Sequence, residues 1–179
     1  IGCRPIDLHL SALRRMGVII TETPETIQCE AGKLLSTSIC FATVSVGATE
    51  SVILAAVLSE GTVRIQNAAC EPEVCAMCDF LRKCGAKIFG DGSRNITIKG
   101  VKKLIPCEYR IPADRIVSGT YLFAAAATGG ELVLREIITD EVKPVLDILE
   151  ECGCRMKCGN DYIVLQSVPR LKAVPYTQT

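Results

Sequence analysis

Tryptophan is absent from this sequence, and the other aromatic residues are few. The 179 residues include four Phe and four Tyr, whereas 49% of all residues are apolar. Aliphatic side chains must therefore dominate the interior. The chain is long enough to bury one large core or two smaller ones.

The sequence also lacks net charge and long apolar runs. Lys and Arg together number 20, as do Asp and Glu, which argues against a broad basic surface for nucleic acid. A few well-placed cations would still suffice to bind a small anionic ligand. No run approaches the roughly 18 consecutive apolar residues that indicate a membrane span.

The composition disfavours a disulfide-bonded scaffold as well. The eleven cysteines are an odd number, scattered among Leu, Ile and Ala, whereas a small secreted scaffold would be shorter and less aliphatic. We expect a reducing cytoplasm, with cysteine used as a small apolar residue. The Cys75-x-x-Cys78 spacing, with Cys70 and Cys84 nearby, could suggest zinc. Because Cys78 and Cys84 fall on the apolar stripe of a predicted helix, we expect core packing and no bound metal.

One eight-residue pattern is present three times, as LRRMGVII at 13–20, LRKCGAKI at 81–88 and LEECGCRM at 149–156. Its Leu and Gly recur every 68 residues, while the residues between them change charge. Gly17, Gly85 and Gly153 each follow the last turn of a predicted helix. Glycine readily takes the left-handed conformation that ends a helix, so the recurrence indicates a structural repeat.

The second and third copies extend into a longer unit, which the pattern predicts to be β-α-β-α-β-β, whereas the first copy lacks the first strand and helix of this unit. Two short strands joined by a tight turn are expected after each shared glycine. Residues 72–85 show an ordinary amphipathic pattern. The segments SVILAAVLS (51–59) and YLFAAAAT (121–128) are instead apolar all round, and we expect these helices to be buried on every side. The predicted fold class is α/β, with helices inside and sheets outside.

Three motifs together resemble one enzyme family: GCRPIDLHL at 2–10, SVGATES at 45–51 and ADRIVSGTYLFAAAATGG at 113–130. With EGTVRIQNAACEPEV between them, the chain resembles UDP-N-acetylglucosamine 1-carboxyvinyltransferases, the enolpyruvyl transferases of peptidoglycan synthesis, along essentially its whole length. The resemblance implies two domains, each an inside-out α/β barrel of three repeat units, with the active site in the cleft between them.

That resemblance also implies where the chain belongs in such an enzyme. Residues 1–110 would be the latter part of the first domain, about one and a half repeat units. Residues 111–179 would be the first unit of the second domain and the start of the next. We therefore expect the chain to be an internal piece of a longer enzyme.

The first group of binding residues implied by the resemblance lies at the start of a predicted helix. Family members hold the uridine end of the sugar nucleotide there, and free N–H groups at a helix start suit an anion. The corresponding residues are Arg4, Pro5, Ile6, Asp7 and Leu8. A merely capped helix with a solvated arginine is the alternative. His9, the only histidine, lies beside the nucleotide in the family, although such a histidine is otherwise most often a surface residue.

A second group is implied where a loop enters the first apolar helix. In the family these positions contact the UDP-sugar, and here they are Thr43, Ser45, Val46 and Gly47. Glycine lets a ligand approach the main chain closely, while backbone N–H groups and a hydroxyl suit an anion. Ser45 or Thr49 as a simple N-cap is the alternative. Asp114 and Arg115 begin the corresponding helix of the second domain and face the cleft in the family, with Asp114 as an N-cap the other interpretation.

The chain departs from the family at several positions. Members often have Lys where Thr43 stands, and usually Glu at the position of Val117 and Arg at that of Cys70. The general-acid cysteine of the family would fall two residues before Ile1. Because Cys3 occupies a variable position, we assign no catalytic residue.

The implied reaction transfers the enolpyruvyl group from phosphoenolpyruvate to the 3-hydroxyl of UDP-N-acetylglucosamine, without a cofactor. We expect these 179 residues alone to be inactive, with the rest of the enzyme as their partner and no nucleic acid or membrane partner. A 3-phosphoshikimate 1-carboxyvinyltransferase-like enzyme is one alternative. A non-catalytic nucleotide-binding repeat module is another, which Val117 and Cys70 favour.

Overall fold

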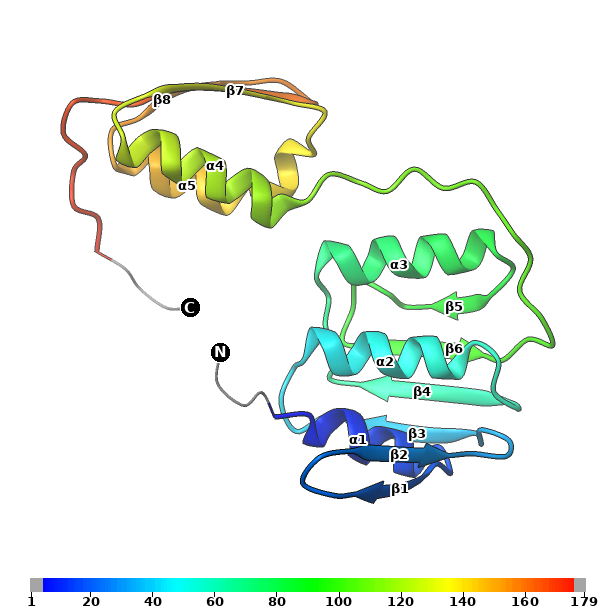
Figure 1. Cartoon of the computed structure of the whole chain (residues 1–179). Helices are drawn as coiled ribbons and strands as arrows, with labels where there is room; N and C mark the ends of the chain where they lie inside the picture. Colours follow the sequence, from blue (N-terminus) through cyan, green and yellow to red (C-terminus); the bar gives the residue numbers. More distant parts are fainter. Residues whose placement is uncertain (1–4, 176–179) are drawn as a thin grey trace. The chain divides into compact units, whose positions relative to one another are not determined.

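The computed structural model describes residues 5–175, which form two compact units, one ending at Tyr109 and the other beginning at Arg110 (Figure 1). The first unit contains α1 (Asp7–Arg15), β1 (Ile19–Glu22), β2 (Ile27–Glu30), β3 (Thr37–Cys40), α2 (Val46–Ala56), β4 (Thr62–Gln66), α3 (Pro72–Lys83), β5 (Lys87–Phe89) and β6 (Asn95–Lys99). The second contains α4 (Arg115–Ala127), β7 (Glu131–Arg135), η1 (Thr139–Val142), α5 (Lys143–Glu151), β8 (Arg155–Cys158) and β9 (Tyr162–Gln166).

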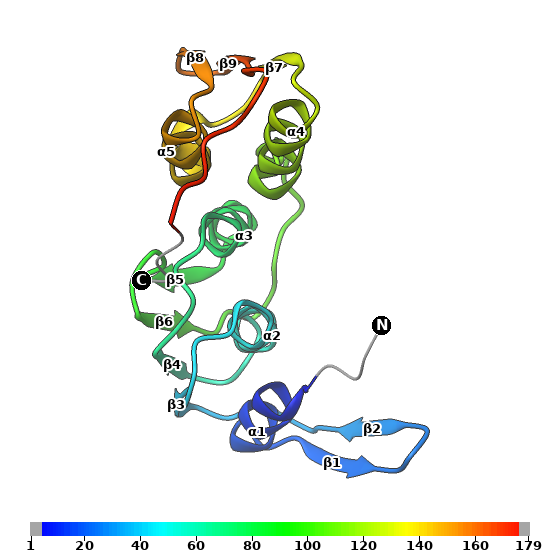
Figure 2. The same cartoon turned by 90° about the vertical axis from the view of Figure 1, so that its left-hand side faces the viewer.

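The first unit is built on a four-stranded sheet in the order β3-β4-β6-β5. Strands β3 and β4 are parallel, so they need a crossover connection, which α2 supplies. Figures 1 and 2 show α2 and α3 on one face of this sheet. Val63 and Ile65 of β4 and Ile96 and Ile98 of β6 are buried, whereas Arg64 between them is exposed. This alternation directs one face of the sheet to the helices and the other to solvent.

The second unit has a three-stranded antiparallel sheet in the order β7-β9-β8. Strands β4, β6 and β5 of the first unit have the same order and antiparallel pairing. Helices α4 and α5 lie side by side on one face of the sheet (Figure 2). Leu122, Leu149, Ile163 and Leu165 are fully buried between helices and strands, so this unit has a core of its own.

The three repeated glycines all end helices in the same way. Gly17, Gly85 and Gly153 have φ values of 93°, 96° and 97°, which confirms the predicted left-handed cap. In each case the residue after the glycine donates its N–H to the carbonyl of the repeated leucine. These bonds are Val18 to Leu13 at 3.1 Å, Ala86 to Leu81 at 2.9 Å and Cys154 to Leu149 at 3.0 Å. An antiparallel pair of strands follows each cap, β1-β2, β5-β6 and β8-β9.

The apolar helices differ from the prediction in their burial. Leu54 on α2 is 54% exposed, and Tyr121 on α4 is 58% exposed. Ile116, Val117 and Phe123 of α4 are exposed as well. Burial on every side is therefore wrong for this chain, because its own sheets cover only one side of each helix. No helix within residues 5–175 is long and apolar enough to cross a membrane.

The cysteines within residues 5–175 differ in burial and are buried, half-buried or exposed. Cys78, Cys84 and Cys154 are buried, which confirms core packing for Cys78 and Cys84. Burial, with a smaller contribution from the charge of Asp91, raises the pKa of the Cys78 thiol to about 12. The small-apolar interpretation is wrong for three exposed cysteines, which are Cys29, Cys40 and Cys158.

Candidate functional site

The start of α1 carries most of the first predicted binding segment. Arg4 lies outside the described residues, as does Cys3. The N-cap of α1 is Ile6, which makes no side-chain capping hydrogen bond, and Asp7 begins the helix with an exposed side chain. The first N–H groups of α1 therefore receive no side-chain cap and can meet an acceptor from solvent or a ligand. Pro5 is exposed, whereas Leu8 is half-buried against the core of the first unit.

The start of α2 carries the second predicted segment. Ser45 is the N-cap, and its hydroxyl accepts a hydrogen bond from the N–H of Ala48 at 3.3 Å. The N-cap interpretation of Ser45 is thus confirmed. Val46 and Gly47 are the first two residues of α2, so their N–H groups have no acceptor within the helix. The helix dipole adds partial positive charge at this end, so the main chain offers two donors to an anion. Thr43 is exposed in the loop just before it.

Residue His9 joins the two segments. A β-carbon placed on Gly47 would lie only 3.0 Å from Nε2 of His9, so the imidazole packs directly on the glycine backbone. His9 is half-buried, and its Nδ1 atom is buried with no hydrogen-bond partner among the described residues. His9 is therefore packed against α2 and is not a fully solvated surface histidine. Because α1 and α2 pack together, residues 5–9 and 43–47 lie next to each other.

A carboxylate of α2, that of Glu50, lies close enough to Glu73 of α3 for their charges to interact. Burial, followed by the charge of Glu73, raises the pKa of Glu50. Glu50 is one helical turn beyond Val46 and so lies on a similar side of α2. One oxygen of Glu71, Oε2, is buried without a hydrogen-bond partner among the residues described. Sequence reasoning missed these carboxylates. The only signal for them in the sequence was the presence of two acidic residues, Glu71 and Glu73, at the start of α3.

Thr49 and Cys70 make hydrogen bonds with the loop that precedes α3. The buried Thr49 accepts a hydrogen bond from the N–H of Ala69 at 3.1 Å, so its hydroxyl ties α2 to the loop before α3 and does not cap α2. Cys70 is half-buried, and its thiol donates to the carbonyl of Ala68 at 3.7 Å. Both side chains therefore contribute to the loop structure.

The start of α4 in the second unit is a well-formed N-cap. The carboxylate of Asp114 accepts hydrogen bonds from the N–H groups of Ile116 at 2.8 Å and Val117 at 3.0 Å. The N-cap interpretation of Asp114 is thereby confirmed. Arg115 is half-buried at the first position of α4, and Val117 is 49% exposed. A substrate contact by Asp114 or Arg115 stays a prediction.

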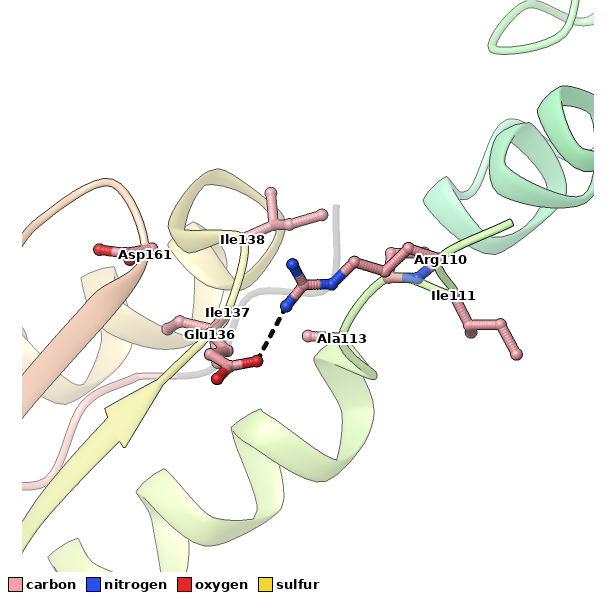
Figure 3. Close-up of a pocket in the computed structure, with 8 residues that line it drawn as sticks. Arg110, Ile111, Ala113, Glu136, Ile137, Ile138 and Asp161 are labelled. Carbon is pink, nitrogen blue, oxygen red and sulfur yellow. Dashed lines mark hydrogen bonds and ion pairs between the residues drawn. The ribbon is translucent and has the colours of Figure 1, made fainter. Parts of the chain in front are cut away.

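An open hollow of about 510 Å³ lies beside the start of α4 (Figure 3). Its lining residues are Arg110, Ile111, Pro112, Ala113, Glu136, Ile137, Ile138 and Asp161. Arg110 donates to Glu136 at 2.9 Å, and both side chains are largely exposed. The guanidinium is thus already paired, and neither Asp114 nor Arg115 lines the hollow. This hollow is therefore a weaker candidate for a binding site than the junction of α1 and α2.

Metal binding has no support in the arrangement of ligating side chains. Within residues 5–175, no group of three or more His, Cys, Asp or Glu residues is placed to hold a metal ion. Cys75 and Cys78 lie on α3, where Cys78 is part of the core.

Comparison with known proteins gives one consistent family. The model of the family EPSP synthase (3-phosphoshikimate 1-carboxyvinyltransferase) matches residues 1–176. UDP-N-acetylglucosamine 1-carboxyvinyltransferase 2 of Caldanaerobacter subterraneus subsp. tengcongensis is 47% identical over 174 residues, which are 97% of this chain and 42% of that protein. The UDP-N-acetylglucosamine 1-carboxyvinyltransferase of Dichelobacter nodosus is 40% identical with the same coverage. The chain thus spans about two fifths of the length of these curated relatives.

Solved structures agree on the fold. The enolpyruvyl transferase NikO from Streptomyces tendae matches with a TM-score of 0.81 and 22% identity, over 96% of this chain and 44% of that one. An EPSP synthase structure from Acinetobacter baumannii matches with a TM-score of 0.66 and 21% identity, over 92% of this chain and 40% of that one. Taken with the family match over residues 1–176 and the curated relatives, these findings confirm the resemblance seen in the sequence motifs: the chain belongs to the EPSP synthase family of enolpyruvyl transferases.

Proposed function

We propose that the enzyme containing these residues transfers the enolpyruvyl group from phosphoenolpyruvate to the 3-hydroxyl of UDP-N-acetylglucosamine. In this proposal the present chain supplies part of the nucleotide-sugar site. The observation that carries it is the packing of His9 on Gly47, 3.0 Å from the position of a β-carbon. That contact joins the two segments in which the sequence predicted UDP-sugar contacts. The relatives bearing this activity in their names are 40% to 47% identical to the chain.

The proposed binding relies on main-chain donors and on the shape of the site. The free N–H groups of Val46 and Gly47, aligned with the dipole of α2, would receive diphosphate oxygens. Arg4 would add a positive charge, and Asp7 would accept hydrogen bonds from the uridine end. Glycine at position 47 keeps the main chain accessible, because any side chain there would compete with the ligand for space.

The proposed chemistry is addition followed by elimination. The oxygen of the sugar hydroxyl attacks the enol carbon of phosphoenolpyruvate and gives up its proton to a base, while an acid protonates the methylene carbon. Loss of a proton from the resulting methyl group then re-forms the double bond as phosphate departs. Positioning and electrostatics contribute to catalysis by holding two anionic substrates together in a desolvated site. Because the chain spans about two fifths of its relatives, we propose that these residues alone bind but do not turn over.

The wider architecture belongs to the same proposal. The two units would be parts of two different domains, each an inside-out barrel with helices inside and sheets outside. Further repeat units would cover the exposed apolar side chains of α4, which include Ile116, Tyr121 and Phe123. The enzyme would be cytoplasmic.

Calorimetric titration of the 179-residue chain with UDP-N-acetylglucosamine tests the proposal. We expect saturable binding that Asp7→Asn weakens about tenfold or more, since a hydrogen bond to a charged group contributes ~1.5–3 kcal/mol. Asp147→Asn is the matched control, because Asp147 lies exposed on α5, in the other unit, and forms an ion pair with Lys143 at 3.0 Å. Absence of binding by a chain with native circular dichroism would refute the proposed site.

The match to the family EPSP synthase (3-phosphoshikimate 1-carboxyvinyltransferase) favours a second candidate, a 3-phosphoshikimate 1-carboxyvinyltransferase-like enzyme. Titration with shikimate 3-phosphate separates the two. Binding of shikimate 3-phosphate without binding of UDP-N-acetylglucosamine would favour the second candidate. Binding of the nucleotide sugar by a longer, folded enzyme without phosphate release would instead favour a non-catalytic nucleotide-binding module.

A further inference from the structure

Two cysteine sulfurs meet at the end of α3. Sγ of Cys84 and Sγ of Cys107 are 3.5 Å apart, the only pair of cysteine sulfurs within hydrogen-bonding distance in residues 5–175. Cys84 is the C-cap of α3 and is 7% exposed, whereas Cys107 lies half-buried in the strand-free segment after β6. The proximity joins positions 23 residues apart in the sequence.

Hydrogen bonds before and after Cys107 hold its segment against α3. The N–H of Ile105 donates to the carbonyl of Cys84 at 2.9 Å. The hydroxyl of Tyr109 donates to the carbonyl of Ala76 at 3.0 Å, and its ring packs edge-on against a phenylalanine of α3 with centroids 5.5 Å apart. The segment is thus fastened to α3 before and after Cys107. A disulfide bond of about 2.05 Å requires the two sulfurs to approach from their separation of 3.5 Å.

The two thiols have different exposures, which assigns them different roles. Burial, and then the hydrogen bond with Cys107, raises the pKa of Cys84. Cys84 is therefore a protonated and shielded thiol at neutral pH. Cys107 is the more accessible of the two, so an oxidant in solution reaches it first.

We propose that Cys84 and Cys107 are a redox site, which hydrogen peroxide or another small peroxide converts into a reversible disulfide. The Cys107 thiolate attacks one peroxide oxygen, the O–O bond breaks, and the second oxygen leaves as hydroxide and is protonated to water. The resulting sulfenic acid at Cys107 is then attacked by the sulfur of Cys84. The S–O bond breaks, and the Cys84 proton leaves with that oxygen as a second water. A small dithiol reverses the bond by exchange.

The disulfide would close a loop that contains β5 and β6 and would attach residues 105–109 covalently to α3. This segment ends at Tyr109, immediately before the second unit begins at Arg110. None of residues 5–9 or 43–47 takes part. The redox site is therefore separate from the proposed nucleotide-sugar site, and the failure of one proposal leaves the other standing.

Peptide mapping of the oxidised chain tests the proposal. The reduced 179-residue chain is treated with hydrogen peroxide, its free thiols are blocked, and it is digested with trypsin without reduction. Exposed lysines at 102 and 103 allow cleavage between the two cysteines. We expect the dominant cross-linked species to contain Cys84 and Cys107, to be two hydrogen atoms lighter than the separate peptides and to disappear after dithiothreitol.

Two variants sharpen the result. Cys107→Ser should abolish the cross-link, while Cys29→Ala, which removes an exposed cysteine on β2, should leave its yield unchanged. If Cys107→Ser fails to fold, the map of the unmodified sequence decides by itself. The proposal would be overturned if Cys84 and Cys107 both still reacted with the thiol-blocking reagent after oxidation, or if they formed disulfides with other cysteines.

Discussion

Replacing Gly47 by alanine should separate the stability of α2 from its capacity to bind a ligand. The new β-carbon would lie 3.0 Å from Nε2 of His9, and the imidazole would have to move by a few tenths of an ångström. Gly47 is the second residue of α2 and does not have a positive φ. Alanine is therefore compatible with the backbone, and the perturbation falls on His9.

Two opposing effects determine the change in the free energy of unfolding. Alanine in place of glycine favours a helix by about 0.5–1 kcal/mol. Forcing His9 off its rotamer costs about 0.5–1.5 kcal/mol. The net change in stability should therefore stay within ~1 kcal/mol. Affinity for UDP-N-acetylglucosamine should fall about tenfold or more, equivalent to ~1.4 kcal/mol, because the methyl group occupies the ligand's approach and displaces His9.

A double-mutant cycle with His9→Ala isolates the contact. With the imidazole removed, Gly47→Ala should give the full helix stabilisation, so the two substitutions should be coupled by about 0.5–1.5 kcal/mol in urea unfolding. Gly119→Ala on α4 is the matched control, because its β-carbon would meet Val145 at an ordinary 3.4 Å. Additive stabilities would refute the packing of His9 on Gly47. Unchanged affinity in a folded Gly47→Ala chain would exclude close ligand approach at this glycine.

Three further outcomes follow from the structure. The pKa of Glu50 is raised in the folded state, so the native chain keeps a proton that the unfolded chain loses, and stability falls as pH rises from the ordinary value through the raised one. Glu50→Gln should thus increase the urea midpoint at pH 7 more than at pH 4, unlike the exposed control Glu25→Gln. An equal shift of the Glu50→Gln midpoint at both pH values would contradict this. Gly85→Ala should cost about 1–2 kcal/mol through its left-handed backbone, measured by chemical unfolding, whereas Gly32→Ala should be nearly neutral, and a neutral Gly85→Ala would contradict the role of the cap. Cys78, with a pKa of about 12, should resist alkylation at pH 8 in the native chain and react after unfolding, as mass spectrometry can measure; rapid labelling of the native chain would count against its burial.

Local sequence determined the ends of the helices and the turns between strands. The left-handed conformations of Gly17, Gly85 and Gly153 and the caps at Ser45 and Asp114 all involve bonds between residues at most five positions apart. Residue type alone selects among such short-range arrangements, since glycine accepts positive φ and Ser or Asp accepts an N–H. The alternation of apolar residues along β4 and β6 likewise accounts for which face of these strands is buried.

Tertiary structure decided which of these local features meet. The contact of His9 with Gly47 spans 38 residues, and that of Cys84 with Cys107 spans 23. The first depends on how α1 packs against α2, and the second on how the segment after β6 lies against α3, which no short motif specifies. The exposure of Tyr121 on α4 was also missed. An apolar helix surface indicates that other residues must cover it, but it does not say whether those residues belong to the same stretch of chain. The sequence by itself therefore determined the family and the elements, while packing of distant segments determined the geometry of the site.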